Sequence, residues 1–218
     1  MTNSRSPKCK CGKTKDVNGN CDGSHANNKR FGSKIIFSLT LIVASFAFQS
    51  FTINDKVEVK NSTIEWKGEK VVGSHQGTIT LKSSELIFQE NMLKGGNFTM
   101  DMTTILCADL SGEYKEKLEG HLKSDDFFSV SNFPTSKIVI TKVNKSSDDN
   151  YNINAKLTIK GITQNINFIA KVTAKNLSAT ITIDRTKFNV KYGSGNFFEN
   201  LGDNMIYDDF EIKVNLEI

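Results

Sequence analysis

The chain has 218 residues, enough for one globular domain and an N-terminal leader. The net charge of +4 comes from the leader: residues 1–34 hold eight Lys or Arg and two acidic residues, so the remainder holds 20 basic and 22 acidic residues. This balance excludes the one-signed surface of a nucleic-acid-binding protein from the main domain, and we expect no nucleic-acid partner. Since only Cys107 lies beyond residue 21, a disulfide framework is excluded there as well.

The basic N-terminal segment, residues 1–34, contains a cluster of metal-binding side chains: Cys9, Cys11, Cys21 and His25. Three thiolates and one imidazole at these spacings can surround one metal centre. The string Cys-Asp-Gly-Ser-His over residues 21–25 resembles the CDGSH iron–sulfur family, whose three Cys and one His hold a [2Fe–2S] cluster. The resemblance implies such a cluster here. Zinc is an alternative, because Cys₃His also suits a tetrahedral structural site, and a metal-free segment is the third.

An uncharged apolar run, Ile35 to Phe48, follows Lys29, Arg30 and Lys34. A basic stretch before an apolar one is typical of a secretory signal. The run has only 14 residues, whereas a spanning helix needs about 20. We predict a signal peptide over residues 35–52 that is cleaved after the run. The alternative is an uncleaved anchor, residues 35–51, that tethers the protein to the inner membrane with its N-terminus in the cytoplasm. Both place the rest of the chain beyond the inner face of the membrane.

Apolar and polar residues alternate repeatedly from Lys56 onward, as in Tyr151 to Ile159. Period-two alternation places one face of a strand on a core and the other in water. Turn signals at residues 94–96, 146–150, 160–161 and 175–176 separate about eight such runs. A set of this size closes to avoid exposed edges. The main domain is therefore predicted to be all-β, a closed antiparallel barrel of about eight strands.

Residues 112–122 break this pattern, because they are good helix formers with few β-branched residues. Tyr114, Leu118 and Leu122 recur every fourth residue and would share one face. We predict one short amphipathic α-helix that packs against the barrel or caps one end.

Two aromatic-rich segments are candidates for a barrel mouth. The connection over residues 191–203 is long for a hairpin and contains Phe197, Phe198 and Leu201. Long loops in compact domains are often lids or rims of sites. Phe127 and Phe128 follow the predicted helix and could serve the same purpose. The alternative is that these side chains only cover the end of the barrel.

Six strings over about residues 56–218 resemble those of the YceI-like family, in the family's order. They are Ile64-Glu-Trp-Lys-Gly68, Gly73-Ser-His-Gln-Gly77, Gly96-Asn-Phe-Thr-Met-Asp-Met102, His121 to Phe128 with Phe133-Pro134, Leu157 to Thr163, and Ile183 to Phe188. The resemblance implies a lipocalin-like barrel in the periplasm that binds a polyisoprenoid or another long-chain amphiphile. It implies no enzyme activity and no cofactor in the barrel.

The candidate ligand-binding residues are inward-facing or mouth residues of this barrel. They are Phe98, Met100, Met102, Phe127, Phe128, Leu157, Ile159, Phe168, Ile183, Phe188, Phe197 and Phe198. A barrel of eight strands can instead be filled by its own side chains. Lys191, Arg185 and His75 are candidates for a headgroup, although Arg185 could make a structural pair with Asp184 or Asp203.

A catalytic site is not predicted. His75 and His121 are the only histidines after the leader, Cys107 reads as a small buried residue, and no G-x-S-x-G elbow occurs. We therefore expect a carrier or sequestering protein for a polyisoprenoid, quinone-like or fatty-acid-like molecule in the cell envelope, with membrane association through residues 35–51 as an option. The alternative is a ligand-free envelope stress or interaction module. The oligomeric state stays open.

Overall fold

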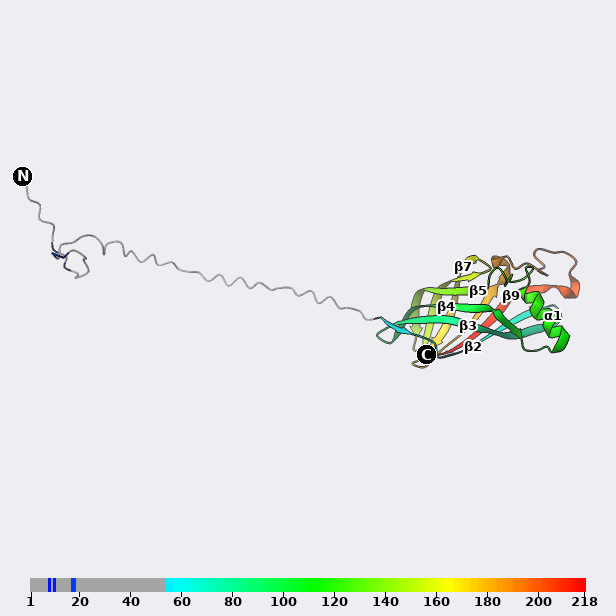
Figure 1. The fold of residues 1–218 in the computed structure, drawn as a ribbon, viewed down its shortest axis with the longest axis horizontal. Coiled ribbons are helices and arrows are strands. Elements are labelled where there is room, and N and C mark those ends of the chain that lie inside the picture. Colours follow the sequence, from blue (N-terminus) through cyan, green and yellow to red (C-terminus); the bar gives the residue numbers. More distant parts are fainter. Residues whose placement is uncertain (1–7, 9, 11–16, 19–53) are drawn as a thin grey trace, which may run out of the picture. The chain divides into compact units, whose positions relative to one another are not determined.

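The computed structural model describes residues 8, 10, 17, 18 and 54–218, which Figure 1 shows in colour. The predicted metal ligands Cys9, Cys11, Cys21 and His25 and the apolar run at 35–52 lie outside the described residues, so both stay predictions. Contacts divide the chain between Gln49 and Ser50, and the fold below is that of the second unit. Within the described part of the chain, the helices fall short of the length and hydropathy needed to cross a bilayer.

Residues 54–218 form the predicted all-β barrel with one α-helix. The elements are β1 (Asp55–Val57), β2 (Asn61–Lys70), β3 (Ser74–Gln89), β4 (Met92–Cys107), α1 (Gly112–Lys123), β5 (Thr135–Ser147), β6 (Asn150–Ile159), β7 (Ile162–Val172), β8 (Asn176–Asp184), η1 (Arg185–Phe188), η2 (Gly202–Asn204) and β9 (Ile206–Glu217).

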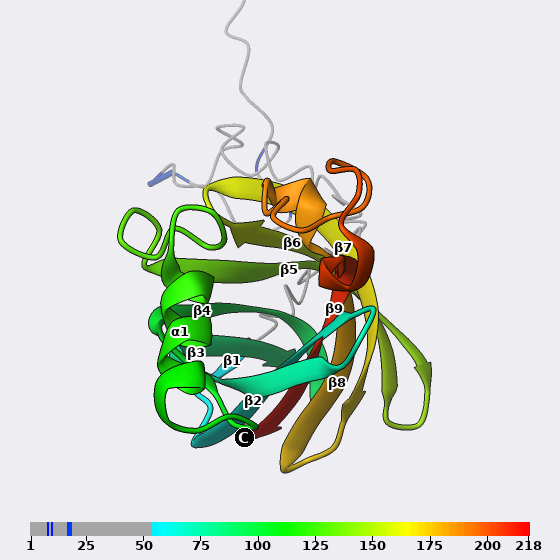
Figure 2. The same cartoon turned by 90° about the vertical axis from the view of Figure 1, so that its right-hand side faces the viewer.

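The sheet closes because β3 pairs on both sides. The order β3-β2-β9-β8-β7-β6-β5-β4 runs around the barrel, and antiparallel pairing of β3 with β4 completes the ring of eight. The short β1 pairs with residues 86–88 of β3, beyond the part that pairs with β2. Figure 2 looks into the barrel from the end where α1 lies.

Strand β6 shows how alternation builds the wall. Its inward residues Tyr151, Ile153, Ala155 and Leu157 are all less than 9% exposed, whereas the residues between them are exposed. A one-residue slip would turn this whole apolar set to solvent, so burial fixes the register of the strand. The sequence alternation therefore predicted the strand and its inner face correctly.

Tight turns join successive strands. Lys160 and Gly161 both have positive φ, 50° and 74°, between β6 and β7, as the type I′ hairpin turn requires. This confirms the predicted turn at residues 160–161. The turn predicted at 94–96 is wrong, because these residues lie inside β4 and the hairpin turns at Glu90 and Asn91 instead. Gly96 is needed there for space: a Cβ would lie 2.8 Å from the Glu85 carbonyl oxygen.

Helix α1 lies at one end of the barrel, as Figures 1 and 2 show, and contacts β4. It spans Gly112–Lys123, in agreement with the prediction. Leu122 is buried and Leu118 packs against the core, but Tyr114 is 76% exposed. The predicted apolar stripe is therefore only two residues long, because Tyr114 is exposed to solvent instead of packing against the barrel.

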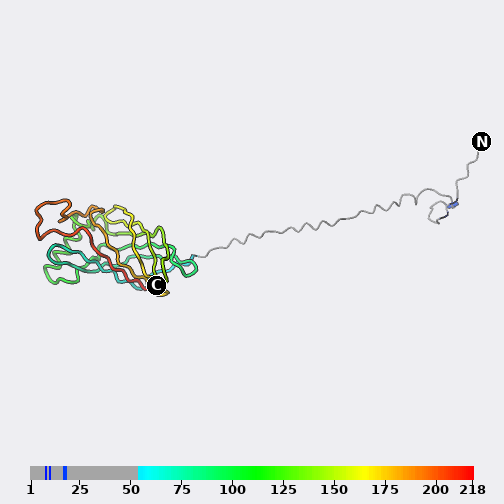
Figure 3. Tube along the Cα trace, turned by 180° about the vertical axis from the view of Figure 1, so that it is seen from behind, coloured from blue at the N-terminus to red at the C-terminus, as the bar shows by residue number. Residues whose placement is uncertain are grey.

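The wall is incomplete toward this end. Strands β7 and β8 pair only at residues 170–172 with 177–179, and β4 and β5 pair only at 96–101 with 135–140. The Cα trace in Figure 3 follows the strands from behind. Buried side chains form two clusters, one containing Trp66, Phe127 and Phe128 and the other containing Leu86 and Phe98.

Candidate ligand cavity

A cavity of about 180 Å³ lies inside the barrel. Inward side chains from β2 to β9 surround it, and Leu122 of α1, Phe127 and Phe128 cover it at the helix end. Its lining reaches both buried clusters, from Trp66 in one to Leu216 in the other. The barrel is therefore not filled by its own side chains, and its core contains space for a guest.

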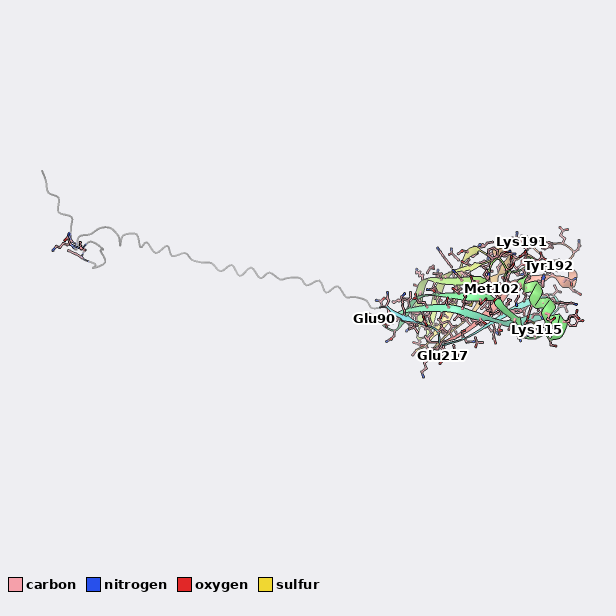
Figure 4. All side chains as sticks on the ribbon, viewed as in Figure 1. Glu90, Met102, Lys115, Lys191, Tyr192 and Glu217 are labelled. Atoms are coloured by element: carbon pink, nitrogen blue, oxygen red, sulfur yellow. The ribbon has the colours of Figure 1, made fainter. Side chains whose placement is uncertain are left out.

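Nine of the twelve predicted ligand-binding residues line this cavity. They are Phe98, Met100, Met102, Phe127, Phe128, Leu157, Ile159, Phe168 and Ile183. They come from four different strands and from the turn after α1, and the strand register brings them together. Figure 4 labels Met102 within the barrel, between Glu90 at one end and Lys115 of α1 at the other.

The other three predicted residues lie elsewhere. Phe188 is 1% exposed and packs in the buried cluster, because η1 folds its side chain against the core rather than along the cavity. Phe197 and Phe198 are 48% and 50% exposed on the connection before β9. The Nζ of Lys191 lies 4.5 Å from the ring centre of Phe197. These aromatics form an exposed loop beside the barrel end instead of its inner lining.

Sequence reasoning missed lining residues from β2, β8 and β9: Ile64, Trp66, Ile181, Phe210, Ile212 and Val214. The signal was available, since Phe210, Ile212 and Val214 share one parity in an alternating run. Both aromatic and aliphatic side chains can line a site for an apolar chain, so the inward parity of a strand is the relevant signal.

Arg185 is a buried cation on the cavity wall, with 2% of the side chain exposed. Its guanidinium donates to the backbone carbonyls of Tyr207, Val190 and Ile206 at 3.1, 2.8 and 3.0 Å. The predicted ion pair of Arg185 with Asp184 or Asp203 is wrong, because the paired carboxylate is that of Asp208. Its Oδ1 lies 3.5 Å from Nη2 of Arg185. Burial lowers the pKa of Arg185, and the charge of Asp208 opposes this shift. A guanidinium nonetheless stays protonated in proteins.

The two other headgroup candidates are directed away from the cavity. His75 Nδ1 is 2.9 Å from Oδ2 of Asp109, and neither residue lines the cavity. Lys191 lies over the exposed ring of Phe197. Arg185 is therefore the predicted headgroup candidate that the fold brings to the lining.

The sequence matches the YceI-like domain over residues 55–218. BcnA from Burkholderia cenocepacia has the same fold, with a TM-score of 0.60 and 20% identity over 72% of this chain and 96% of BcnA. A polyisoprenoid binding domain from Saccharophagus degradans, implicated in plant cell wall breakdown, gives a TM-score of 0.51 and 9% identity over 76% of this chain and 97% of that domain. No curated protein matches the sequence. Because the family match covers most of the residues, the chain belongs to the YceI-like domain family.

Proposed function

We propose that this protein binds an amphiphile by enclosing its apolar chain in the barrel, and that it carries or sequesters this molecule without transforming it. The observation that carries the proposal is the cavity, whose lining is built almost wholly from apolar side chains of eight strands. The S. degradans domain of the same fold is described as polyisoprenoid binding, which supports a chain-like ligand.

The size of the cavity limits the ligand. One enclosed water needs at least about 10–15 Å³ of such space, and the 180 Å³ here is roughly a dozen times that minimum. The cavity therefore has room for part of an apolar chain and not only for isolated water molecules. At about 0.8 kcal/mol per methylene, a chain of about 15 carbons gains roughly 12 kcal/mol. Association costs at least about 4 kcal/mol, which leaves an affinity near micromolar.

The charges near the cavity favour a neutral headgroup. Arg185 already contacts three carbonyls and Asp208, so its charge is balanced within the protein. A carboxylate ligand would have to compete with Asp208 in a buried setting, where an unpaired charge is costly. We therefore infer an alcohol-like or quinone-like headgroup in preference to a fatty acid.

The same lining supports the proposal of binding without catalysis. Its ionisable groups are the Arg185 guanidinium, Lys137 and the Tyr207 phenol. A guanidinium is a poor proton carrier at neutral pH, and an apolar wall offers little to stabilise a developing charge. We accordingly propose no enzymatic step.

The direct test is to extract the purified full-length protein with organic solvent and analyse the extract by mass spectrometry. We expect an uncharged long-chain lipid at nearly one molecule per protein. An empty barrel that also does not bind an added isoprenoid alcohol would contradict the proposal and favour the ligand-free interaction module.

A pair of variants on β8 tests whether the cavity is the site. Ala179 lines the cavity, and its neighbour Thr180 is exposed on the outer face. Ala179→Phe should fill part of the space and weaken binding of the isoprenoid alcohol at least tenfold, as measured by displacement of a fluorescent lipid. Thr180→Phe adds the same ring outside the barrel and should leave the affinity unchanged. Equal effects of the two variants would argue against the cavity.

We also propose that the domain acts in the periplasm, free after cleavage or tethered through residues 35–51. The basic flank and the apolar run support export. A long-chain amphiphile is poorly soluble in water, so a carrier in the envelope would have a physical use.

A further inference from the structure

Three metal-binding side chains meet away from the cavity, where β3 begins and β4 ends. They are His75, Cys107 and Asp109, and their Nδ1 or Nε2, Sγ and carboxylate atoms all lie within 4.8 Å of one another. His75 Nδ1 is 2.9 Å from Oδ2 of Asp109, and the Cys107 thiol donates to Oδ1 of the same carboxylate at 3.1 Å. His75 and Cys107 come from two paired strands, since Gly77 and Cys107 are partners across β3 and β4, and Asp109 follows the end of β4 by two residues.

The order of these contacts does not suit nucleophilic catalysis. A cysteine nucleophile needs its base in direct contact, with the carboxylate behind the base. Here the carboxylate lies between Cys107 and His75 and contacts both. Cys107 is also only 1% exposed, and burial together with the hydrogen bond to Asp109 raises the pKa of its thiol. The arrangement gathers three donor atoms around one point instead of forming a relay.

The backbone around the cluster is held from several sides. Oδ1 of Asp109 accepts from the Gln76 amide at 3.0 Å, and the Ala108 amide donates to the Gln76 carbonyl at 2.8 Å. The Cys107 amide donates to Glu119 of α1 at 2.8 Å. A site whose donors are positioned before binding loses little entropy when the ligand arrives.

The approach from solvent stays open. The side chains of His75 and Asp109 are 33% and 27% exposed, whereas Cys107 forms the floor of the cluster. The Asp109 carboxylate lies at the centre of the cluster, where it accepts from the Gln76 amide and contacts His75 Nδ1 and the Cys107 thiol. A cation therefore meets a negative charge at the centre of the cluster.

We propose that His75, Cys107 and Asp109 form a binding site for a divalent transition metal, best matched by Zn²⁺. Thiolate, imidazole and carboxylate are its usual ligands, and three of them leave a fourth position for water. Calcium and magnesium are disfavoured, because they select sites made of oxygen ligands. On binding, the thiol proton passes to solvent, and the neutral imidazole coordinates through Nδ1 with its hydrogen on Nε2.

The present distances are close to those that zinc requires. Bonds of about 2.0–2.3 Å in a tetrahedron place donor atoms about 3.4 Å apart. The two contacts with Asp109 are 2.9 and 3.1 Å long, and the third pair of donor atoms lies within 4.8 Å. Side-chain shifts of about an ångström would therefore complete the site.

The test uses the full-length chain carrying Cys9→Ser, Cys11→Ser, Cys21→Ser and His25→Ala, which removes the donors of the leader. After metal stripping, Zn²⁺ is titrated in competition with a chromogenic chelator. We expect one tightly bound Zn²⁺ per chain. His75→Ala and Cys107→Ser should each weaken it at least tenfold, since even residues that only support a ligand alter affinity by about 10–100-fold. His121→Gln, which removes a histidine outside the cluster, should bind as the parent does.

Cobalt provides a second measurement that a purely structural role would not affect. Co²⁺ in this site should give a thiolate-to-cobalt charge-transfer band that Cys107→Ser abolishes and His121→Gln retains. Unchanged zinc affinity in His75→Ala, or a cobalt complex without the thiolate band, would overturn the proposal. If circular dichroism shows that Cys107→Ser is unfolded, His75→Ala alone decides, because His75 is partly exposed and its loss leaves the core intact.

Discussion

Gly77 of β3 lies against the indole of Trp66, at a position where β3 pairs with β4. A Cβ at this position would collide with the Leu106 carbonyl and lie 2.7 Å from the indole of Trp66. The same indole donates to that carbonyl at 3.0 Å, so the contact cannot move without losing a hydrogen bond. We expect Gly77→Ala to lower the free energy of unfolding by about 2–4 kcal/mol in urea denaturation.

Gly120 provides the opposite case as a control. It lies inside α1, and a Cβ there would meet nothing within 4 Å. Gly120→Ala should therefore stabilise the protein by up to about 1 kcal/mol through helix propensity. Similar effects of the two substitutions would show that the crowding around Trp66 is not what requires a glycine at position 77.

Asp184 caps η1 and makes stability depend on pH. Its Oδ1 accepts from the amide and the hydroxyl of Thr186 at 3.0 and 2.6 Å. Burial raises the pKa of Asp184, but these hydrogen bonds and Lys187 outweigh it, so the pKa falls below 3.8. A carboxyl group whose pKa is lower in the folded than in the unfolded protein stabilises the fold at pH values above its unfolded-state pKa. This stabilisation is lost as the pH falls through the folded-state pKa.

Asp184→Ala should consequently cost about 1 kcal/mol in the free energy of unfolding at neutral pH. The difference from the parent should shrink as the pH is taken below 3.8, where the parent carboxylate becomes protonated. Urea denaturation of the parent and the variant from neutral pH to below 3.8 measures this difference in the free energy of unfolding. Asp126→Ala, at an exposed turn position, serves as the control. A difference that stays constant with pH would rule out this role of the carboxylate.

Individual site residues show where sequence reasoning reaches its limit. Met102 and Phe168 were placed correctly, because alternation within one strand fixes which side chains point inward. Phe188 and the partner of Arg185 were placed wrongly, because both depend on how η1 meets β9. Such contacts between distant segments carry no local periodic signal.

Among the elements, β7 and β8 form the weakest join in the barrel. They pair only at residues 170–172 with 177–179, and farther along β7 the side-chain amide of Gln164 donates to the Lys187 carbonyl of η1 at 3.1 Å. Amides of residues 162–169 that face β8 therefore lack a ladder partner. In hydrogen–deuterium exchange, we expect about half of the amides in this segment to exchange rapidly, because unpaired backbone groups open easily.

Strand β6 is the internal comparison, since it pairs along its length with both β5 and β7. Its amides at residues 151–158 should exchange slowly. Equal protection of β6 and of residues 162–169 would mean that the wall is closed in solution. The alternation of β7 predicted a strand but not this gap, because the length of a pairing depends on twist and on the neighbouring turn, not on which residues alternate.

At the scale of the whole molecule, the barrel is built from local patterns that repeat along the chain. Closure, strand count and helix position were predicted because each follows from local patterns repeated along residues 56–218. The volume of the cavity could not be predicted, because it is the small difference between the size of the barrel and the side chains inside it. The predictions for residues 1–52 rest on the cysteine motif and on the basic stretch before the apolar run.

The motif still leads to a definite expectation for the complete protein. If residues 35–51 anchor the chain, Cys9, Cys11, Cys21 and His25 face the reducing cytoplasm, where free thiols survive. Full-length protein purified anaerobically should then show visible absorption from a [2Fe–2S] cluster. His25→Ala should alter or abolish this spectrum, and His121→Gln should retain it. One equivalent of zinc without colour would instead indicate a Cys₃His zinc site.

N-terminal sequencing of the protein from a membrane or periplasmic fraction decides between these states. A start at residue 1 in the membrane fraction means that the anchor and the metal segment persist. A start shortly after the apolar run in the soluble fraction means that the signal peptide is removed, so that the barrel works alone. A colourless and metal-free protein that keeps its N-terminus would refute the leader cluster while leaving the barrel proposal untouched, since the cavity is built wholly from residues 64–216.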